Sequence, residues 1–191
     1  MERPERPGAP GTLADAVVER SGSGAEVVLA PVGAAHLDEL WGLFADVVAR
    51  GDGFPQQQPL TRAGFEDVWV RPVTVVVGAT VEGRLAGAYY LKPNGPGLAA
   101  HIANAGYVVD RRRRGGGIGR LLVADSVLRA PLAGFDAVQF NFVFASNPAR
   151  AMYEELGWRQ IGRIPDAVAR PGRPVEDAII YWRRVDGEGP A

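Results

Sequence analysis

The chain contains no cysteine at all. Disulfide bonds, thiolate zinc sites and a cysteine nucleophile are therefore excluded. Histidine is almost as scarce, because His36 and His101 are the only two. Two histidines are too few for a histidine-rich metal site, and we expect no bound metal.

Long hydrophobic runs are also missing from the sequence. No apolar stretch approaches the ~20 residues of a membrane-spanning helix, and the first residues, Met-Glu-Arg-Pro, contain no hydrophobic signal core. A strong net charge is absent too, since the formal net charge is -1, and this argues against a nucleic-acid partner. We expect a cytoplasmic protein that binds neither membranes nor nucleic acid.

The composition is that of an ordinary soluble globular protein, with 47% hydrophobic and 23% charged residues in a chain of 191. This length suits one domain. Residues 1–24 are rich in Pro, Gly, Ala and Ser, which predicts a mobile N-terminal tail. We therefore expect the domain to span residues 25–186, followed by a short tail at 187–191.

Hydrophobic periodicity predicts an α/β fold with about seven strands and four helices. Helices are expected at 37–48, after the N-cap Thr61, from 118, and after Asn147-Pro148; strands are expected at 26–30, 73–81, 85–91, 101–110, 137–144, 159–164 and 178–183. The strand–helix–strand order of the second half indicates a partly parallel sheet with helices on its faces.

A glycine-rich turn, Arg114 to Gly119, lies between an expected strand and an expected helix. Free amides at a helix N-terminus and the helix dipole form an anion site, and the arginines at 111–114 and 120 add positive charge. A Walker loop is excluded because Gly119 is followed by Arg-Leu and not by Lys-Ser/Thr. A dinucleotide fingerprint fails because its last glycine position holds Arg120 or Leu122. A solvated arginine run beside a flexible turn is the main alternative, and a nuclear-localisation or nucleic-acid patch is a weaker one because the run is short.

The pattern Arg-x-x-Gly-x-Gly at Arg114, Gly117 and Gly119 resembles the coenzyme A loop of the GCN5-related N-acetyltransferase (GNAT) superfamily. The resemblance implies a mixed, mostly antiparallel sheet whose central strands splay apart to hold coenzyme A. It also implies acetyl-CoA as the cosubstrate. The residues it assigns to the coenzyme are Tyr107, Val108, Val109, Arg114, Gly115, Gly116, Gly117, Ile118, Gly119, Arg120 and Asn147.

A second block of residues follows the loop in the order that the superfamily expects. Asn147, Tyr153 and Leu156-Gly157-Trp158 come between two expected strands. The resemblance assigns Tyr153 as the proton donor to the leaving thiolate, while packing in the core is its alternative role. The general base stays open among Glu66, Asp67, His101, Glu176, Asp177, a main-chain carbonyl and an ordered water.

Two asparagines, Asn104 and Asn141, lie inside apolar strands, where each needs a hydrogen-bond partner. That partner is either structural or an acceptor substrate. The segments around them resemble fungal proline-analogue N-acetyltransferases, which acetylate azetidine-2-carboxylate and related imino acids. This resemblance implies acetyl transfer to a small-molecule amine, with both asparagines at the acceptor. Protein Nα- or lysine acetylation and acyl-CoA binding without catalysis remain alternatives, and a homodimer stays open.

Overall fold

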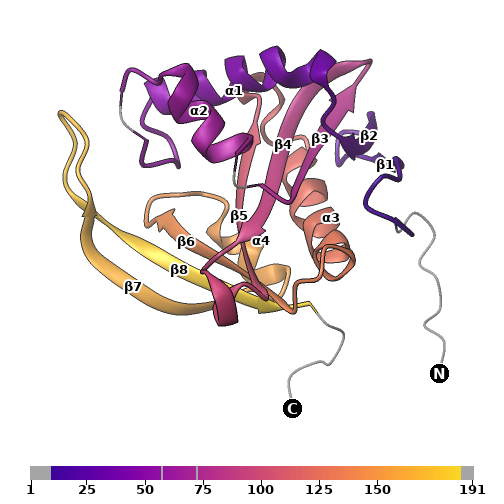
Figure 1. Cartoon of the computed structure of the whole chain (residues 1–191). Helices are drawn as coiled ribbons and strands as arrows, with labels where there is room; N and C mark the ends of the chain where they lie inside the picture. Colours follow the sequence, from indigo (N-terminus) through magenta and orange to yellow (C-terminus); the bar gives the residue numbers. More distant parts are fainter. Residues whose placement is uncertain (1–9, 57, 72, 186–191) are drawn as a thin grey trace.

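An eight-stranded sheet runs through the molecule, and helices cover both of its faces (Figure 1). The computed structural model describes residues 10–56, 58–71 and 73–185. The strand order is β1-β2-β3-β4-β5-β6-β8-β7. Every neighbouring pair is antiparallel except β5 and β6, which are parallel. The expected α/β fold with a mixed sheet is confirmed, and the sheet has one strand more than the seven expected.

The elements follow the hydrophobic pattern of the sequence closely. The strands are β1 (Val17–Arg20), β2 (Glu26–Pro31), β3 (Val75–Val81), β4 (Arg84–Pro93), β5 (Ile102–Val109), β6 (Ala137–Phe144), β7 (Arg159–Val168) and β8 (Glu176–Arg184). The helices are α1 (Leu37–Ala49), α2 (Arg62–Trp69), α3 (Ile118–Leu132) and α4 (Arg150–Glu155). Thr61 caps α2 as predicted, because its hydroxyl accepts a hydrogen bond from the Gly64 amide at 3.1 Å.

The prediction of a mobile tail over residues 1–24 is wrong for the described residues 10–24. Strand β1 pairs with β2, from Val17 opposite Leu29 to Arg20 opposite Glu26. The segment before β1 is held by a buried guanidinium, which composition did not reveal. Residues 1–9 and the tail predicted at 187–191 lie outside the described residues.

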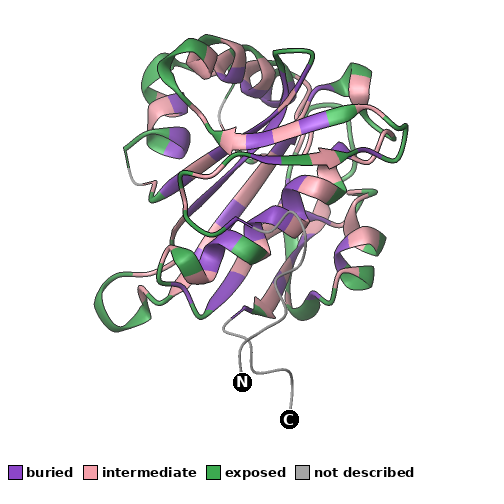
Figure 2. Cartoon of the chain, turned by 90° about the vertical axis from the view of Figure 1, so that its right-hand side faces the viewer, coloured by how far each residue is buried: buried purple, intermediate pink, exposed green. Residues whose placement is uncertain are grey.

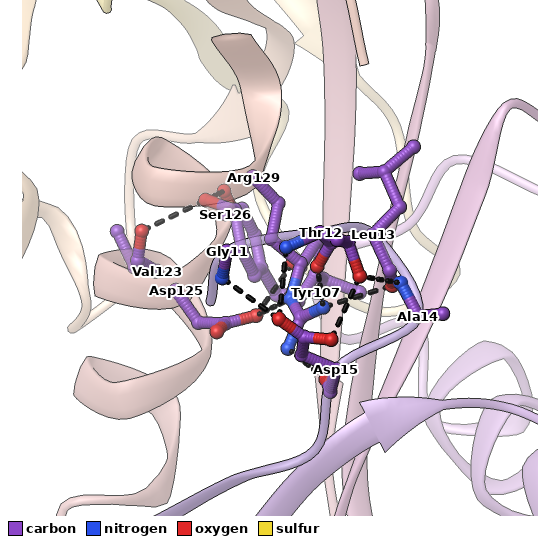
Figure 3. Close-up of polar contacts among 11 residues, drawn as sticks. Gly11, Thr12, Leu13, Ala14, Asp15, Tyr107, Val123, Asp125, Ser126 and Arg129 are labelled. Atoms are coloured by element: carbon purple, nitrogen blue, oxygen red, sulfur yellow. Dashed lines mark hydrogen bonds and ion pairs between the residues drawn. The ribbon is translucent and has the colours of Figure 1, made fainter. Parts of the chain in front are cut away.

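That guanidinium belongs to Arg129 of α3, whose side chain is fully buried (Figure 3). It donates hydrogen bonds to the carbonyls of Leu13 and Asp15, both at 2.9 Å. Its Nε also pairs with Asp125 at 2.8 Å, and the same carboxylate accepts the Tyr89 hydroxyl at 2.7 Å. Asp125 therefore interrupts the apolar stripe of α3 because it is the counterion of the buried arginine.

Two apolar cores lie on the two faces of the sheet. Helix α3 packs over one core, which includes Leu122 and Phe140. Helices α1 and α2 pack over the other, which includes Phe44, Trp69 and Tyr90. Figure 2 shows the buried residues concentrated on the central strands and on the inner sides of the helices. None of the helices in the described part of the chain is long and apolar enough to cross a membrane.

Candidate active site

The parallel strands β5 and β6 separate after only three paired positions. The ladder runs from Ile102 opposite Ala137 to Asn104 opposite Gln139 and then stops. Strand β5 stays paired with β4 as far as Val109, whereas the pairing of β6 with β8 shifts register between Phe140 and Val143. A bulge of this kind bends a strand away from its neighbour. The β5 peptide groups beyond Asn104 therefore face an open gap and offer hydrogen bonds to a ligand.

This gap forms a cleft of about 1060 Å³. It collects all but one of the site residues that the sequence predicts. The cleft is lined by Tyr107, Val108 and Val109 of β5, by Arg114, Gly115, Gly117, Ile118, Gly119 and Arg120 of the glycine loop and α3, by Asn147 and Tyr153, and by Asn104 and Asn141. The exception is Gly116, where an added Cβ would lie 3.5 Å from the Ser23 hydroxyl of the turn between β1 and β2.

One end of the cleft is built to bind an anion. Gly117 is the N-cap of α3 and adopts φ +89°, a left-handed conformation that favours glycine. The first hydrogen bond of the helix runs from the Leu121 amide to the Gly117 carbonyl at 3.2 Å. The amides of residues 118–120 precede it, have no partner within the helix, and carry the positive end of the helix dipole.

Three arginines line this end of the cleft, namely Arg113, Arg114 and Arg120. Arg120 pairs with Glu155 at 2.8 Å on the surface. The other two arginines near the glycine loop, Arg111 and Arg112, do not line the cleft. Arg112 instead turns to Asp110, with 2.8 Å between Nη2 and Oδ2, and this hydrogen bonding lowers the pKa of the Asp110 carboxyl. Fewer arginines therefore line the cleft than the run at 111–114 suggests.

Tyr153 reaches the cleft from α4 and is 7% exposed. Its ring contacts those of Phe140 and Tyr181, with centroids 5.0 and 5.8 Å away. Burial, and secondarily the Tyr181 phenol, raises the pKa of Tyr153 to about 12. The hydroxyl therefore keeps its proton at neutral pH. Tyr153 packs in the core and also lines the cleft, so its packing does not exclude the predicted role of its hydroxyl.

Asn147 lies in the turn that leads into α4, which begins two residues later than the sequence predicts. Its side-chain oxygen accepts a hydrogen bond from the Ala149 amide at 2.9 Å. This bond fixes the turn, so the expected capping function is present in an altered form. The same side chain lines the cleft beside the glycine loop.

Asn104 and Asn141 both have partners within the protein. The Asn104 amide donates to the Gln139 carbonyl at 3.2 Å and accepts the Tyr90 hydroxyl at 3.2 Å. Asn104 therefore joins β5 to β6 at the point where the strands separate. Asn141 donates to the Asn94 side chain at 2.6 Å. Each amide nitrogen carries two hydrogens and donates one of them in these bonds, and both residues line the cleft.

None of the five candidate bases lines the cleft. Glu66 and Asp67 pair with Arg71 on the surface of α2, and the His101 ring nitrogen contacts the Leu98 carbonyl at 2.9 Å. Glu176 pairs with Arg170, and Asp177 pairs with Arg163. The carboxylate that does line the cleft is Asp52, which pairs with Arg50 at 3.0 Å. Within the described residues, no group of acidic and histidine side chains is placed to hold a metal ion.

Comparison with known proteins agrees with this geometry. The model of the family described as "Acetyltransferase (GNAT) family" matches residues 37–158, more than half of the chain. The chain belongs to the GNAT acetyltransferase family. Membership confirms the expected acetyltransferase with acetyl-CoA as its donor, and the free α3 amides, the flanking arginines and the unpaired β5 edge suit that ligand.

This acetyltransferase is similar to N-acetyltransferase aca1 of Schizosaccharomyces pombe, with 33% identity over 152 residues that cover 70% of this chain and 73% of the relative. A solved GCN5-related N-acetyltransferase from Kribbella flavida has a TM-score of 0.77 and 28% identity, covering 83% of this chain and 97% of that one. A phosphinothricin acetyltransferase from Sinorhizobium meliloti, solved with acetyl-CoA, shares the fold with a TM-score of 0.73 at 21% identity, covering 83% and 88% of the two chains.

The acetyltransferase cleft contains further residues that the sequence did not single out. Tyr90 and Lys92 reach it from β4, the loop after α1 contributes residues 52–56, and Arg170 and Arg173 reach it from the β7–β8 connection. The signal for Lys92 was its place at the end of an otherwise apolar strand. The β7–β8 connection had no sequence signal, because it reaches the cleft through the fold alone.

Proposed function

We propose that this acetyltransferase acetylates the amine of a small molecule, with amino or imino acids as the preferred acceptors. The observation that carries the proposal is the closure of the cleft on the side of α1 and α2. Arg170 of the β7–β8 connection donates to the Gly51 carbonyl at 3.3 Å and also pairs with Glu176. Two loops that are 119 residues apart in sequence therefore meet over the cleft. Such a cover suits a small acceptor better than a folded protein chain.

The likeness to N-acetyltransferase aca1 and the resemblance to fungal proline-analogue acetyltransferases support a small acceptor. Asn104 and Asn141 occupy the positions of that resemblance. Asn104 lies at the apex of the gap between β5 and β6, where an acceptor meets the acyl end of a donor that runs along β5. Azetidine-2-carboxylate and similar cyclic imino acids are the first acceptors to test.

The donor fits the cleft along its length. The amides of Ile118, Gly119 and Arg120 hold the pyrophosphate at the N-terminus of α3. The unpaired edge of β5 at residues 107–109 hydrogen-bonds the pantetheine arm as an added strand would. A free β5 amide near Tyr107 or Val108 stabilises the oxyanion as the carbonyl carbon becomes tetrahedral.

In the proposed reaction, acetyl-CoA supplies an activated thioester. The acceptor nitrogen attacks the carbonyl carbon, the C–N bond forms, the C–S bond breaks, and the nitrogen loses its proton to water. The Tyr153 hydroxyl faces the departing sulfur. Because the pKa of Tyr153 is raised to about 12 and that of a thiol is roughly 8.5, the phenol donates a hydrogen bond to the thiolate, which then takes its proton from solvent.

The test is a panel of amines, amino acids and cyclic imino acids incubated with acetyl-CoA, with detection of free thiol. Tyr153→Phe should abolish most turnover. Tyr181→Phe is the matched control, because its hydroxyl is bound to Glu154 and Arg150 behind the cleft. Acetylation only of proteins, seen by intact-mass spectra, would contradict a small-molecule acceptor. Acetyl-CoA binding in calorimetry without turnover on any acceptor would contradict catalysis altogether.

A further inference from the structure

Lys92 is the only lysine in a chain with 21 lysine and arginine residues. Its side chain lines the cleft from β4 and is half-buried. A lysine ammonium is a compact charge with three donors on a flexible stem, unlike the rigid fork of an arginine. The one lysine of this protein therefore lines the cleft.

The surroundings of Lys92 lack an anion to balance its charge. Its Nζ lies 4.9 Å from the centre of the Tyr90 ring, and among the described residues it has no salt bridge. Asp67 acts on it only at a distance and is itself paired with Arg71. Burial lowers the pKa of Lys92, as expected for an ammonium that is partly removed from water without a counterion.

Three of the other cations of the cleft differ from Lys92 in this respect. Arg170 is bound to Glu176, Arg114 lies 4.0 Å from Asp52, and Arg120 is paired with Glu155. Arg113 follows β5 beside the glycine loop, at the end that suits the pyrophosphate. Arg173 lies on the β7–β8 connection and is the rival to Lys92 for an anionic acceptor group.

Lys92 also has a fixed relation to Asn104. The two residues are directly opposed in the β4–β5 ladder, so their side chains lie on the same face of the sheet with Cβ atoms roughly 5 Å apart. Tyr90 links them, because its hydroxyl donates to Asn104 and its ring contacts Lys92. A ligand whose amine lies near Asn104 and whose anionic group binds Lys92 therefore has these two groups only a few bonds apart.

We propose that Lys92 binds the carboxylate of the acceptor, so that this acetyltransferase selects α-amino or α-imino acids over amines without an acidic group. This inference rests on the proposed small-molecule function and names the residue that determines its acceptor specificity. The two asparagines are weaker candidates for the carboxylate, because each already donates to a protein oxygen. A bound carboxylate supplies the counterion that Lys92 lacks.

The kinetic test compares a cyclic imino acid with its neutral carboxamide in the full chain. Lys92→Met keeps the length of the stem and removes the charge. It should lower kcat/KM about 10- to 100-fold for the acid, the range of a charge-assisted hydrogen bond, and less than about 3-fold for the carboxamide. Lys92→Arg should retain most of the activity on the acid. An arginine cannot act as a base, so this rescue separates a carboxylate anchor from a general base.

Two control variants make the result specific. Arg84→Met removes the same charge from the exposed end of the same strand and should behave like the wild type. Arg173→Met tests the rival cation. The proposal is overturned if Lys92→Met loses equally on acid and carboxamide, or if the acid-specific loss appears in Arg173→Met instead.

A binding measurement separates this inference from the proposed function. Lysine labelled with 13C at Cε gives one side-chain signal, because the chain has one lysine. The titration midpoint of that signal should rise when the imino acid binds in the presence of coenzyme A, since a bound carboxylate favours the charged form. The carboxamide should leave it unchanged. A rise without turnover would support the carboxylate site and reject catalysis, and turnover without a rise would reject the carboxylate site alone.

Discussion

Gly117 combines two constraints, so replacing it with alanine should affect both stability and coenzyme binding. Its φ of +89° costs an alanine roughly 1–2 kcal/mol. An added Cβ would also lie 2.7 Å from the backbone nitrogen of Gly22 in the β1–β2 turn. Relief of this contact requires a shift of the backbone at the start of α3 or in the β1–β2 turn. Overpacking of this kind costs roughly 1–3 kcal/mol.

The sum is roughly 3 kcal/mol. For a domain of this size each kcal/mol lowers Tm by roughly 2–4 °C, so Gly117→Ala should melt about 6–12 °C below the wild type. Gly115→Ala and Gly24→Ala are matched controls, because both positions have positive φ but nothing within 4 Å of the added Cβ. In these variants only the positive φ destabilises the protein, so their Tm should fall by roughly 2–8 °C.

Coenzyme binding should fall in the same variant. Displacing the α3 amides weakens one or two hydrogen bonds to a charged group, roughly 1.5–3 kcal/mol, so the Kd for acetyl-CoA should rise about 10- to 100-fold. At a concentration of 100 times the wild-type Kd, acetyl-CoA stabilises the wild type by about 2.7 kcal/mol. The same concentration should stabilise Gly117→Ala by only about 0.4–1.4 kcal/mol.

Thermal melts with and without acetyl-CoA, together with calorimetry, measure both quantities. If Gly117→Ala melts at the temperature of the Gly24→Ala control and binds acetyl-CoA as tightly as the wild type, the contact with Gly22 does not constrain the glycine loop.

Three further predictions concern single side chains. Tyr153→Phe should lower kcat about 10- to 100-fold, the range of a hydrogen bond to a charged group, in thiol-release assays without weakening acetyl-CoA binding, and the wild type should show no basic limb from this tyrosine below its pKa of about 12. Arg129→Met should destabilise the protein by roughly 3–5 kcal/mol in denaturant titrations, because it leaves Asp125 buried without a counterion. A loss of stability no larger than that caused by replacing an exposed arginine would contradict this structural role of Arg129. Asp110→Asn should be less stable than the wild type at neutral pH. Arg112 lowers the folded-state pKa of Asp110. The difference in stability between the wild type and the variant should therefore be largest above the ordinary pKa of 3.8 and should disappear as pH falls through the lower folded-state pKa. A difference in stability that does not depend on pH would contradict this prediction.

Most of the fold was predictable from local patterns. The alternation and the helical spacing of apolar residues placed seven of the eight strands and all four helices, because each buries one apolar face. Strand β1 was missed for a physical reason. Its segment has a loop-like composition, and it is fixed by Arg129, which lies more than 100 residues away in the sequence. A pattern read along the chain does not register a contact of that kind.

The candidate site was predictable only where a motif stands in one stretch of sequence. The glycine loop, Asn147 and Tyr153 belong to such stretches, and the fold brings them to one cleft. Lys92 and Arg170 come from separate elements that meet only in three dimensions. The placement of the candidate bases could not be predicted for the same reason, since residue type alone did not show that Glu176 pairs with Arg170 and Asp177 with Arg163, and that neither carboxylate lines the cleft.

The central claim is acetyl transfer to a small amine that carries a carboxylate. The most direct measurement is thiol release from acetyl-CoA by the full chain with a cyclic imino acid and, separately, with its carboxamide. We expect turnover of both the imino acid and its carboxamide, with kcat/KM higher for the acid by about 10- to 100-fold. This preference should be lost in Lys92→Met. Equal turnover of the two acceptors, or acetylation of proteins alone, would contradict it.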